Sequence, residues 1–175
     1  IATTTSVVNS GLLDAILPQF HDQSVRVHAA GSGRSLAMLA EGTVALVISH
    51  APVAEQESLS SHPNWRYQKL AYNRFVLVGP RADPASVRGR MSAADALKSI
   101  AANGAPFISR GDSSGTHERE TILWKLAGVT PQVLVSGAGM AVTLRQADSR
   151  GAYTLTDEAT WRQLQSDLDG LSVLF

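Results

Sequence analysis

Three segments of the sequence carry small hydroxyl and glycine residues directly before an expected helix. They are residues 3–6 (Thr-Thr-Thr-Ser), 31–33 (Gly-Ser-Gly) and 113–116 (Ser-Ser-Gly-Thr). The first turn of a helix has free backbone N–H groups and about half a positive charge. Serine and threonine add hydroxyl donors, and glycine lets a ligand approach the backbone, so such segments suit an oxyanion. The alternative is that each segment only caps its helix.

The third segment carries additional chemistry, because it follows an expected strand at residues 106–109 and contains an arginine and an aspartate. The guanidinium of Arg110 is permanently charged, and its planar fork of donors matches an oxyanion. Asp112, two residues later, is placed to hold that guanidinium as a partner behind the ligand. The helix start supplies further donors, from Ser114, Gly115 and Thr116. The alternative is a surface Arg–Asp pair beside a capped helix.

Apolar periodicity and turn residues predict strands and helices in alternation along the whole chain. The expected helices are 12–20, 35–41, 92–103, 114–126, 141–147 and 157–168, and the expected strands are 25–29, 44–48, 67–79, 106–109, 132–135, 152–155 and 171–175. The continuous apolar run at 44–48 is typical of a strand buried on both faces. This alternation indicates an α/β fold with mostly parallel sheets flanked by helices.

A polar stretch with two prolines, residues 79–84, follows the longest expected strand and is a candidate crossing between domains. The sequence therefore predicts a first lobe at residues 1–80 and a second lobe at residues 81–175.

The composition excludes several classes of protein. The 175 residues include no cysteine, which excludes zinc-finger, iron–sulfur, thiol-catalytic and disulfide-scaffold proteins. The 15 basic residues balance 15 acidic ones, which argues against a nucleic-acid partner or a polybasic membrane module. No dinucleotide fingerprint, P-loop, nucleophile elbow or metalloprotease motif occurs, and the histidines lack the spacing of metal ligands.

The pattern Arg-x-Asp-x-Ser-Gly-Thr at residues 110–116 resembles the anion-binding signature of periplasmic phosphate-binding proteins. A wider set of segments resembles the tungstate-binding proteins of ABC importers: residues 3–6, 10–14, 50–52, 72–80, 109–117, 137–140 and 152–157. These segments occur in order through nearly the whole chain. The resemblance implies a class II periplasmic-binding-protein fold, in which two α/β lobes close on a small oxyanion.

Carried onto this sequence, the resemblance implies a ligand set of hydroxyl, N–H and guanidinium donors: Thr4, Thr5, Ser6, Ser32, Arg110, Ser114, Gly115 and Thr116. His50 stands where the phosphate-binding relatives have an aspartate that accepts a hydrogen bond from the protonated ligand. Tungstate and molybdate are fully deprotonated dianions at neutral pH, so a histidine that donates suits them better than a carboxylate. The alternative for His50 is a local hydrogen bond at a strand end. Gly139 and Met140 either line the site from the second lobe or form a tight turn into a helix.

The resemblance further implies a substrate-binding protein that passes tungstate or molybdate to the membrane permease of an ABC importer. We expect a monomeric, extracytoplasmic protein without a cofactor, a resident metal, a nucleic-acid partner or catalytic activity. The chain begins at Ile1 and not at Met, which allows a removed signal peptide. Two alternatives remain: an anion-sensing effector domain of a regulator, and an enzyme that grips a phosphorylated or sulfated substrate.

Proteins of the resembled family continue past a strand equivalent to residues 171–175 and return to complete the first lobe. We therefore expect either that this chain is truncated or that its first lobe is completed in another way.

Overall fold

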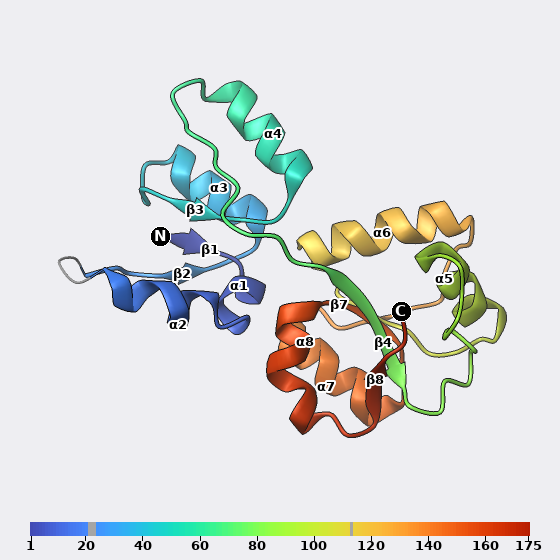
Figure 1. Cartoon of the computed structure of the whole chain (residues 1–175). Helices are drawn as coiled ribbons and strands as arrows, with labels where there is room; N and C mark the ends of the chain where they lie inside the picture. Colours follow the sequence, from blue (N-terminus) through green and yellow to red (C-terminus); the bar gives the residue numbers. More distant parts are fainter. Residues whose placement is uncertain (21–23, 113) are drawn as a thin grey trace. The chain divides into compact units, whose positions relative to one another are not determined.

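A computed structural model describes residues 1–20, 24–112 and 114–175, so Ser113 of the third segment lies outside the described residues. The chain forms two compact units, Ile1–Asn73 (unit 1) and Arg74–Phe175 (unit 2) (Figure 1). The sequence predicts a boundary between residues 80 and 81, at the end of strand β4 (Phe75–Pro80). In the structure β4 belongs to unit 2, and the units divide within the exposed segment 66–74.

Unit 1 alternates short strands with helices. Its elements are β1 (Ala2–Thr3), α1 (Thr5–Asn9), α2 (Leu12–Ile16), the 3-10 helix η1 (Leu17–Gln19), β2 (His28–Ala29), α3 (Ser32–Ala40), β3 (Val47–Ile48) and α4 (Pro52–Ser61). Strand β1 lies between β2 and β3 and runs parallel to both (Figure 1). The loops that follow β1, β2 and β3 therefore leave the sheet at the same edge, and the candidate residues of unit 1 lie on these loops or in the first turns of the helices after them.

Two strands of unit 1 are shorter than predicted, and the expected strand 25–29 contracts to β2. The expected strand 44–48 contracts to β3, whose residues are half-buried, so the prediction of burial on both faces is wrong. Leu46 beside it is 48% exposed, which shows that a continuous apolar run does not by itself imply a covered strand.

Helix α4 was not predicted, because its apolar residues do not recur at helical spacing. Pro52 at its first turn is the sequence signal for it.

Unit 2 is larger and contains β4 (Phe75–Pro80), α5 (Ala93–Ala102), β5 (Ile108–Ser109), α6 (Gly115–Ala127), β6 (Leu134–Val135), α7 (Met140–Arg150), β7 (Thr154–Asp157), α8 (Glu158–Leu164), the 3-10 helix η2 (Gln165–Asp167) and β8 (Leu171–Val173). Strand β4 lies between β7 and β8 and runs antiparallel to both, whereas β5 pairs with β6 in parallel. The predicted α/β fold is confirmed, and the antiparallel β4 is the departure from mostly parallel pairing.

Helices cover both faces of the strands of unit 2 (Figure 1). On one face Leu77 of β4 packs in a core with side chains of α5 and α6, including Ile100 and Trp124. On the other face Val78 packs with side chains of α7 and α8, including Leu144. Adjacent residues of β4 face opposite cores because side chains alternate along a strand. This layered core fixes the end of β5 and the start of α6, where the arginine segment lies.

Local sequence signals explain where the helices of unit 2 begin and end. The hydroxyl of Ser92 caps α5 by accepting from the Asp95 N–H at 3.1 Å, and Gly128 ends α6 with a φ of 67°. Within the described residues, no helix has both the length and the apolar character needed to cross a membrane.

Candidate functional site

Strand β5 and helix α6 position the arginine segment. Ile108 donates its N–H to the carbonyl of Tyr153 at 2.8 Å, which ties the strand into the core of unit 2. Arg110 follows directly, and the chain turns at Gly111, whose φ is 60°. The turn leads into α6, whose N-cap residue Ser114 accepts from the His117 N–H at 3.3 Å. The fold therefore holds an arginine beside the positive end of a 13-residue helix.

The side chain of Arg110 is 2% exposed, and the described residues pair its guanidinium only in part. Its Nη2 forms an ion pair with Asp112. Its Nε and Nη1 are buried and have no hydrogen-bond partner among the described residues. Burial opposes ionisation of Asp112, but hydrogen bonds from Ser114 and Arg110, together with the arginine's charge, lower the pKa of Asp112 below its usual 3.8. Two donor groups of this charged guanidinium are thus available to an acceptor that the described residues do not supply.

Thr116, the second residue of α6, adds another buried donor. Its side chain is 0% exposed, and its Oγ1 has no partner within the described part of the chain.

One turn later on the same face, the buried carboxylate of Glu120 accepts a hydrogen bond from the backbone N–H of Arg110 at 3.3 Å. Burial raises the pKa of Glu120 above its usual 4.5, because its hydrogen bonds and the charge of His117 oppose the effect only in part. Glu120 therefore fixes the backbone from which the Arg110 side chain extends.

The loop between β6 and α7 is tied to the same backbone. Gly137 donates its N–H to the carbonyl of Arg110 at 3.0 Å. Gly139 is the N-cap residue of α7 and forms no side-chain cap. Met140 is fully buried and packs in the core with Ile108, so its side chain serves packing. The structure thus places the backbone of this predicted loop beside Arg110, while the Met140 side chain lies in the core.

In unit 1 the predicted hydroxyl residues lie at two helix starts. Thr4 is the N-cap residue of α1 and accepts from the Val7 N–H at 3.2 Å. Thr5 and Ser6 form the first turn of that helix, and Ser6 is buried. Ser32 begins α3 and is 1% exposed, and its Oγ has no partner among the residues that the structure describes. Capping therefore accounts for Thr4, but not for the hydroxyl of Ser32.

The structure brings His50 and Thr4 together. His50 lies between β3 and α4, and its Nε2 is 3.1 Å from Thr4 Oγ1. Glu55, one turn into α4, holds the loop around His50: its Oε1 accepts from Ser49 Oγ at 2.7 Å and from the Ala51 N–H at 3.0 Å. The hydrogen-bond partner of His50 is therefore a residue 46 positions away in the sequence, and this partner is itself a predicted ligand.

The sequence predictions did not include Glu55 and Glu120 among the functional residues. Glu120 falls in the buried stripe of α6 with Leu123, Trp124 and Ala127, and a carboxylate in an apolar helical stripe is the signal that could have identified it. Glu55 has a weaker signal, an acidic residue four positions after the N-cap Ala51. Both act on backbone groups, which sequence patterns alone do not reveal.

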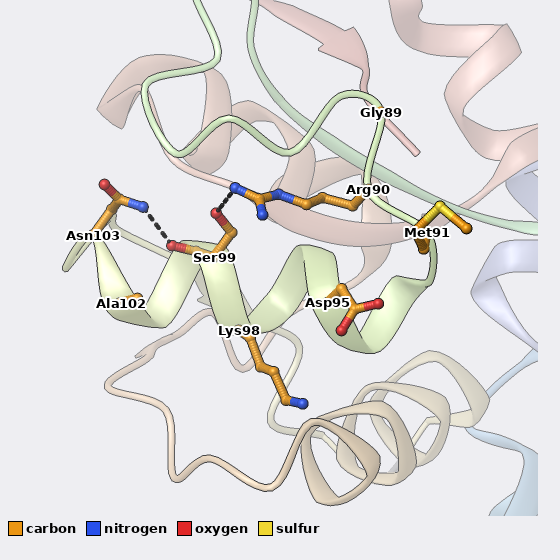
Figure 2. Close-up of a pocket in the computed structure, with 8 residues that line it drawn as sticks. All are labelled: Gly89, Arg90, Met91, Asp95, Lys98, Ser99, Ala102 and Asn103. Carbon is orange, nitrogen blue, oxygen red and sulfur yellow. Dashed lines mark hydrogen bonds between the residues drawn. The ribbon is translucent and has the colours of Figure 1, made fainter.

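A surface hollow of about 530 Å³ lies elsewhere on unit 2, along α5 and the loop before it (Figure 2). It contains none of the predicted ligand residues. The guanidinium of Arg90 in this hollow is already engaged: Nη2 donates to Ser99 Oγ at 2.8 Å, and Nε donates to the Ser86 carbonyl at 2.8 Å. The buried donors around Arg110 are therefore the better candidate for an anion.

In residues 1–20, 24–112 and 114–175, no three His, Asp or Glu side chains are grouped as a metal ion would require.

Comparison with known proteins assigns this chain to a family. A family model described as a PBP superfamily domain matches residues 1–174, and the chain belongs to this superfamily. Within it, the predicted resemblance to tungstate-binding proteins is confirmed. The tungstate-binding protein TupA of Peptoclostridium acidaminophilum is 37% identical over 182 residues, which cover 99% of this chain and 63% of that protein.

Solved structures agree with this similarity. The tungstate ABC transporter structure from Geobacter sulfurreducens is 41% identical with a TM-score of 0.91, covering 99% of this chain and 78% of that one. The tungstate-binding protein TupA from Desulfovibrio alaskensis G20 is 40% identical with a TM-score of 0.81, covering 99% of this chain and 73% of that one. The chain spans 51% to 64% of the length of the curated relatives that it matches.

Proposed function

We propose that this chain captures a tetrahedral oxyanion, tungstate or molybdate, as the substrate-binding part of an ABC importer. Two of its relatives are tungstate-binding proteins and a third is described as part of a tungstate ABC transporter, at 37% to 41% identity. The chemistry is reversible binding by preorganised donors, and no bond of the ligand is made or broken. This similarity favours transport over the effector domain of a regulator.

The observation that carries the proposal is the guanidinium of Arg110, whose buried Nε and Nη1 have no partner among the described residues. Burying a charged donor without a partner is strongly unfavourable, and a protein retains one where a ligand supplies the missing acceptor. A tetrahedral dianion has four acceptor oxygens and matches the guanidinium fork. Ser114, Gly115 and Thr116 add the start of α6, where backbone N–H groups and the helix dipole favour negative charge.

We infer that unit 1 by itself also carries donors suited to an anion. The buried Oγ of Ser32 lacks a partner in the described residues, and Thr4 contacts His50. The carboxylates near Arg110 are engaged by donors: Asp112 by Arg110 and Ser114, and Glu120 by the Arg110 N–H. A set rich in donors, whose carboxylates are occupied, favours a fully deprotonated dianion over a protonated phosphate.

The partners follow from this function. The anion is the cargo, and the membrane permease of the importer receives it. The protein acts outside the cytoplasm, as a monomer and without a resident cofactor or metal.

A thermal unfolding panel tests the proposal. Tungstate, molybdate, sulfate, phosphate and a sugar phosphate are each added to the protein at micromolar concentrations. A ligand at 100 times its dissociation constant stabilises the folded state by about 2.7 kcal/mol, which is a shift of several degrees. We expect this shift with tungstate and molybdate. A response confined to the sugar phosphate would instead favour an enzyme, and no response to any anion would refute the function.

A further inference from the structure

The hydroxyl of Thr4 has two neighbours in unit 1 that constrain its single proton. Its oxygen accepts the Val7 N–H at 3.2 Å, as the cap of α1, and lies 3.1 Å from the Nε2 of His50. A hydroxyl has one proton and two lone pairs, whereas a histidine nitrogen either donates or accepts. The state of His50 Nε2 therefore decides where the Thr4 proton points.

Two arrangements are open to this pair. Where Nε2 accepts, the Thr4 proton is used in the bond to His50, and the hydroxyl has no donor left. Where Nε2 carries hydrogen, both lone pairs of Thr4 Oγ1 receive donors, from His50 and from Val7. The hydroxyl proton is then directed away from the chain's own groups and is available to a bound acceptor. An anion selects the second arrangement, since it binds only donors.

The position of His50 depends on Glu55. This carboxylate is 9% exposed and lies on α4, and one of its oxygens accepts from both neighbours of His50 in the sequence, Ser49 and Ala51. Glu55 thereby fixes the residues on either side of His50 against the start of α4. Thr3 Oγ1 donates to the Ile48 carbonyl at 2.8 Å, which holds the segment before Thr4 to the end of β3.

We propose that His50 acts on the bound oxyanion through Thr4, by donating from Nε2 so that the Thr4 hydroxyl donates to the anion, and that Glu55 positions His50 for this role. The inference deepens the proposed function and rests on it. His50 and Glu55 are positioning residues in this account, while Thr4 contacts the ligand. This differs from the sequence prediction, in which His50 donates to the ligand itself.

A double-mutant cycle on tungstate affinity tests the link between His50 and Thr4. Thr4→Val removes the hydroxyl, and we expect a loss of roughly tenfold or more. His50→Leu should weaken binding about two- to tenfold when Thr4 is present, because the hydroxyl is no longer oriented. In the Thr4→Val background, His50→Leu should change the affinity less than about twofold. Thr4→Ser keeps the hydroxyl and should restore the dependence on His50.

Glu55 is tested in the same two backgrounds. Glu55→Gln keeps an acceptor oxygen for the loop and should retain most of the affinity, whereas Glu55→Leu should weaken binding only where Thr4 is present. Glu57→Gln, on the exposed side of the same helix, is the matched control and should bind like the wild type. Unfolding temperatures of all variants show that each is folded, and Glu55→Gln keeps the test valid if Glu55→Leu does not fold.

Two results would overturn the proposal. Equal losses from His50→Leu with and without the Thr4 hydroxyl would mean that His50 contacts the anion directly. Equal losses from Glu55→Leu in the two backgrounds would mean that Glu55 has a general structural role only. Failure of the proposed function looks different, because the wild-type protein itself would then not bind tungstate.

Discussion

Replacing Thr116 with valine should move stability and affinity in opposite directions. The side chain is fully buried and its Oγ1 has no partner in the described residues, so valine of nearly the same shape removes an unsatisfied hydroxyl. An unsatisfied buried polar group costs about 1–3 kcal/mol. Without ligand, the Thr116→Val protein should therefore be more stable, by about 1 kcal/mol or more. For a chain of this length the unfolding temperature should rise by roughly 2–4 °C for each kcal/mol.

The same substitution should weaken anion binding. A hydrogen bond to a charged group contributes about 1.5–3 kcal/mol, so losing the Thr116 donor should lower the affinity for tungstate about 10- to 150-fold. Thermal unfolding without ligand measures the first effect, and calorimetric titration with tungstate measures the second.

Thr121→Val is the matched control for this experiment. Thr121 is exposed on the same helix, and its Oγ1 donates to the His117 carbonyl at 2.9 Å. Its replacement should change stability by less than about 0.5 kcal/mol and leave the affinity unchanged. A Thr116→Val protein that is less stable than the wild type and binds tungstate equally well would refute the reasoning, because Thr116 would then be a structural donor.

Three further predictions concern the surroundings of the site. Gly111→Ala should destabilise the protein by about 1–3 kcal/mol and weaken tungstate binding, because the new Cβ would lie 2.3 Å from the Val135 side chain at a backbone φ of 60°. Gly128→Ala is the control, since Gly128 has a similar φ but open space around it, and it should have the smaller effect on unfolding and none on binding. Burial opposes ionisation of Asp83, but hydrogen bonds from two backbone N–H groups and from Tyr153 lower its pKa below 3.8. The stabilisation by the Asp83 carboxylate is therefore present above about pH 4 and is lost as the pH falls through the folded pKa. Asp83→Asn should reduce this loss of unfolding free energy at acid pH, measured by urea unfolding, and an unchanged loss would contradict the assignment. Burial raises the pKa of Tyr153 to about 12, so the stabilisation of the fold by the neutral phenol is present below pH 10 and lost between pH 10 and 12. Tyr153→Phe should remove this loss of stability at alkaline pH. Ultraviolet titration of the wild type should show the Tyr153 phenol ionising at a higher pH than an ordinary tyrosine.

Local signals were sufficient to predict two helices of unit 2, α5 and α6. The predicted helix at 92–103 appears as α5, because Ser92 and Asn103 stand at its two ends. The predicted helix at 114–126 appears as α6, since a hydroxyl cap and a positive-φ glycine mark its limits. Cap residues act on their own helix, so their effect can be read from the sequence without knowledge of the fold.

Non-local features were not predictable in the same way. The antiparallel pairing of β4 with β7 joins residues about 80 positions apart, and alternation along one strand does not reveal the direction of its partner. The expected strand at 67–79 begins only at Phe75, because the residues before it are exposed and cross between the units. The apolar stripe of α6 could have marked Glu120 as buried, but its hydrogen bond with the backbone N–H of Arg110 could not be predicted, because a backbone donor is the same for nearly every residue type.

Calorimetric titration of the wild type and of Arg110→Ala with tungstate tests the central claim most directly. Arg110 offers two buried nitrogens without partners among the described residues, and hydrogen bonds from charged donors contribute about 1.5–3 kcal/mol each. We predict that the wild type binds tungstate, that Arg110→Ala binds it at least about 100-fold more weakly while remaining folded, and that Arg90→Ala, a control outside the predicted ligand set, binds like the wild type. Unchanged tungstate affinity in a folded Arg110→Ala protein would contradict the account.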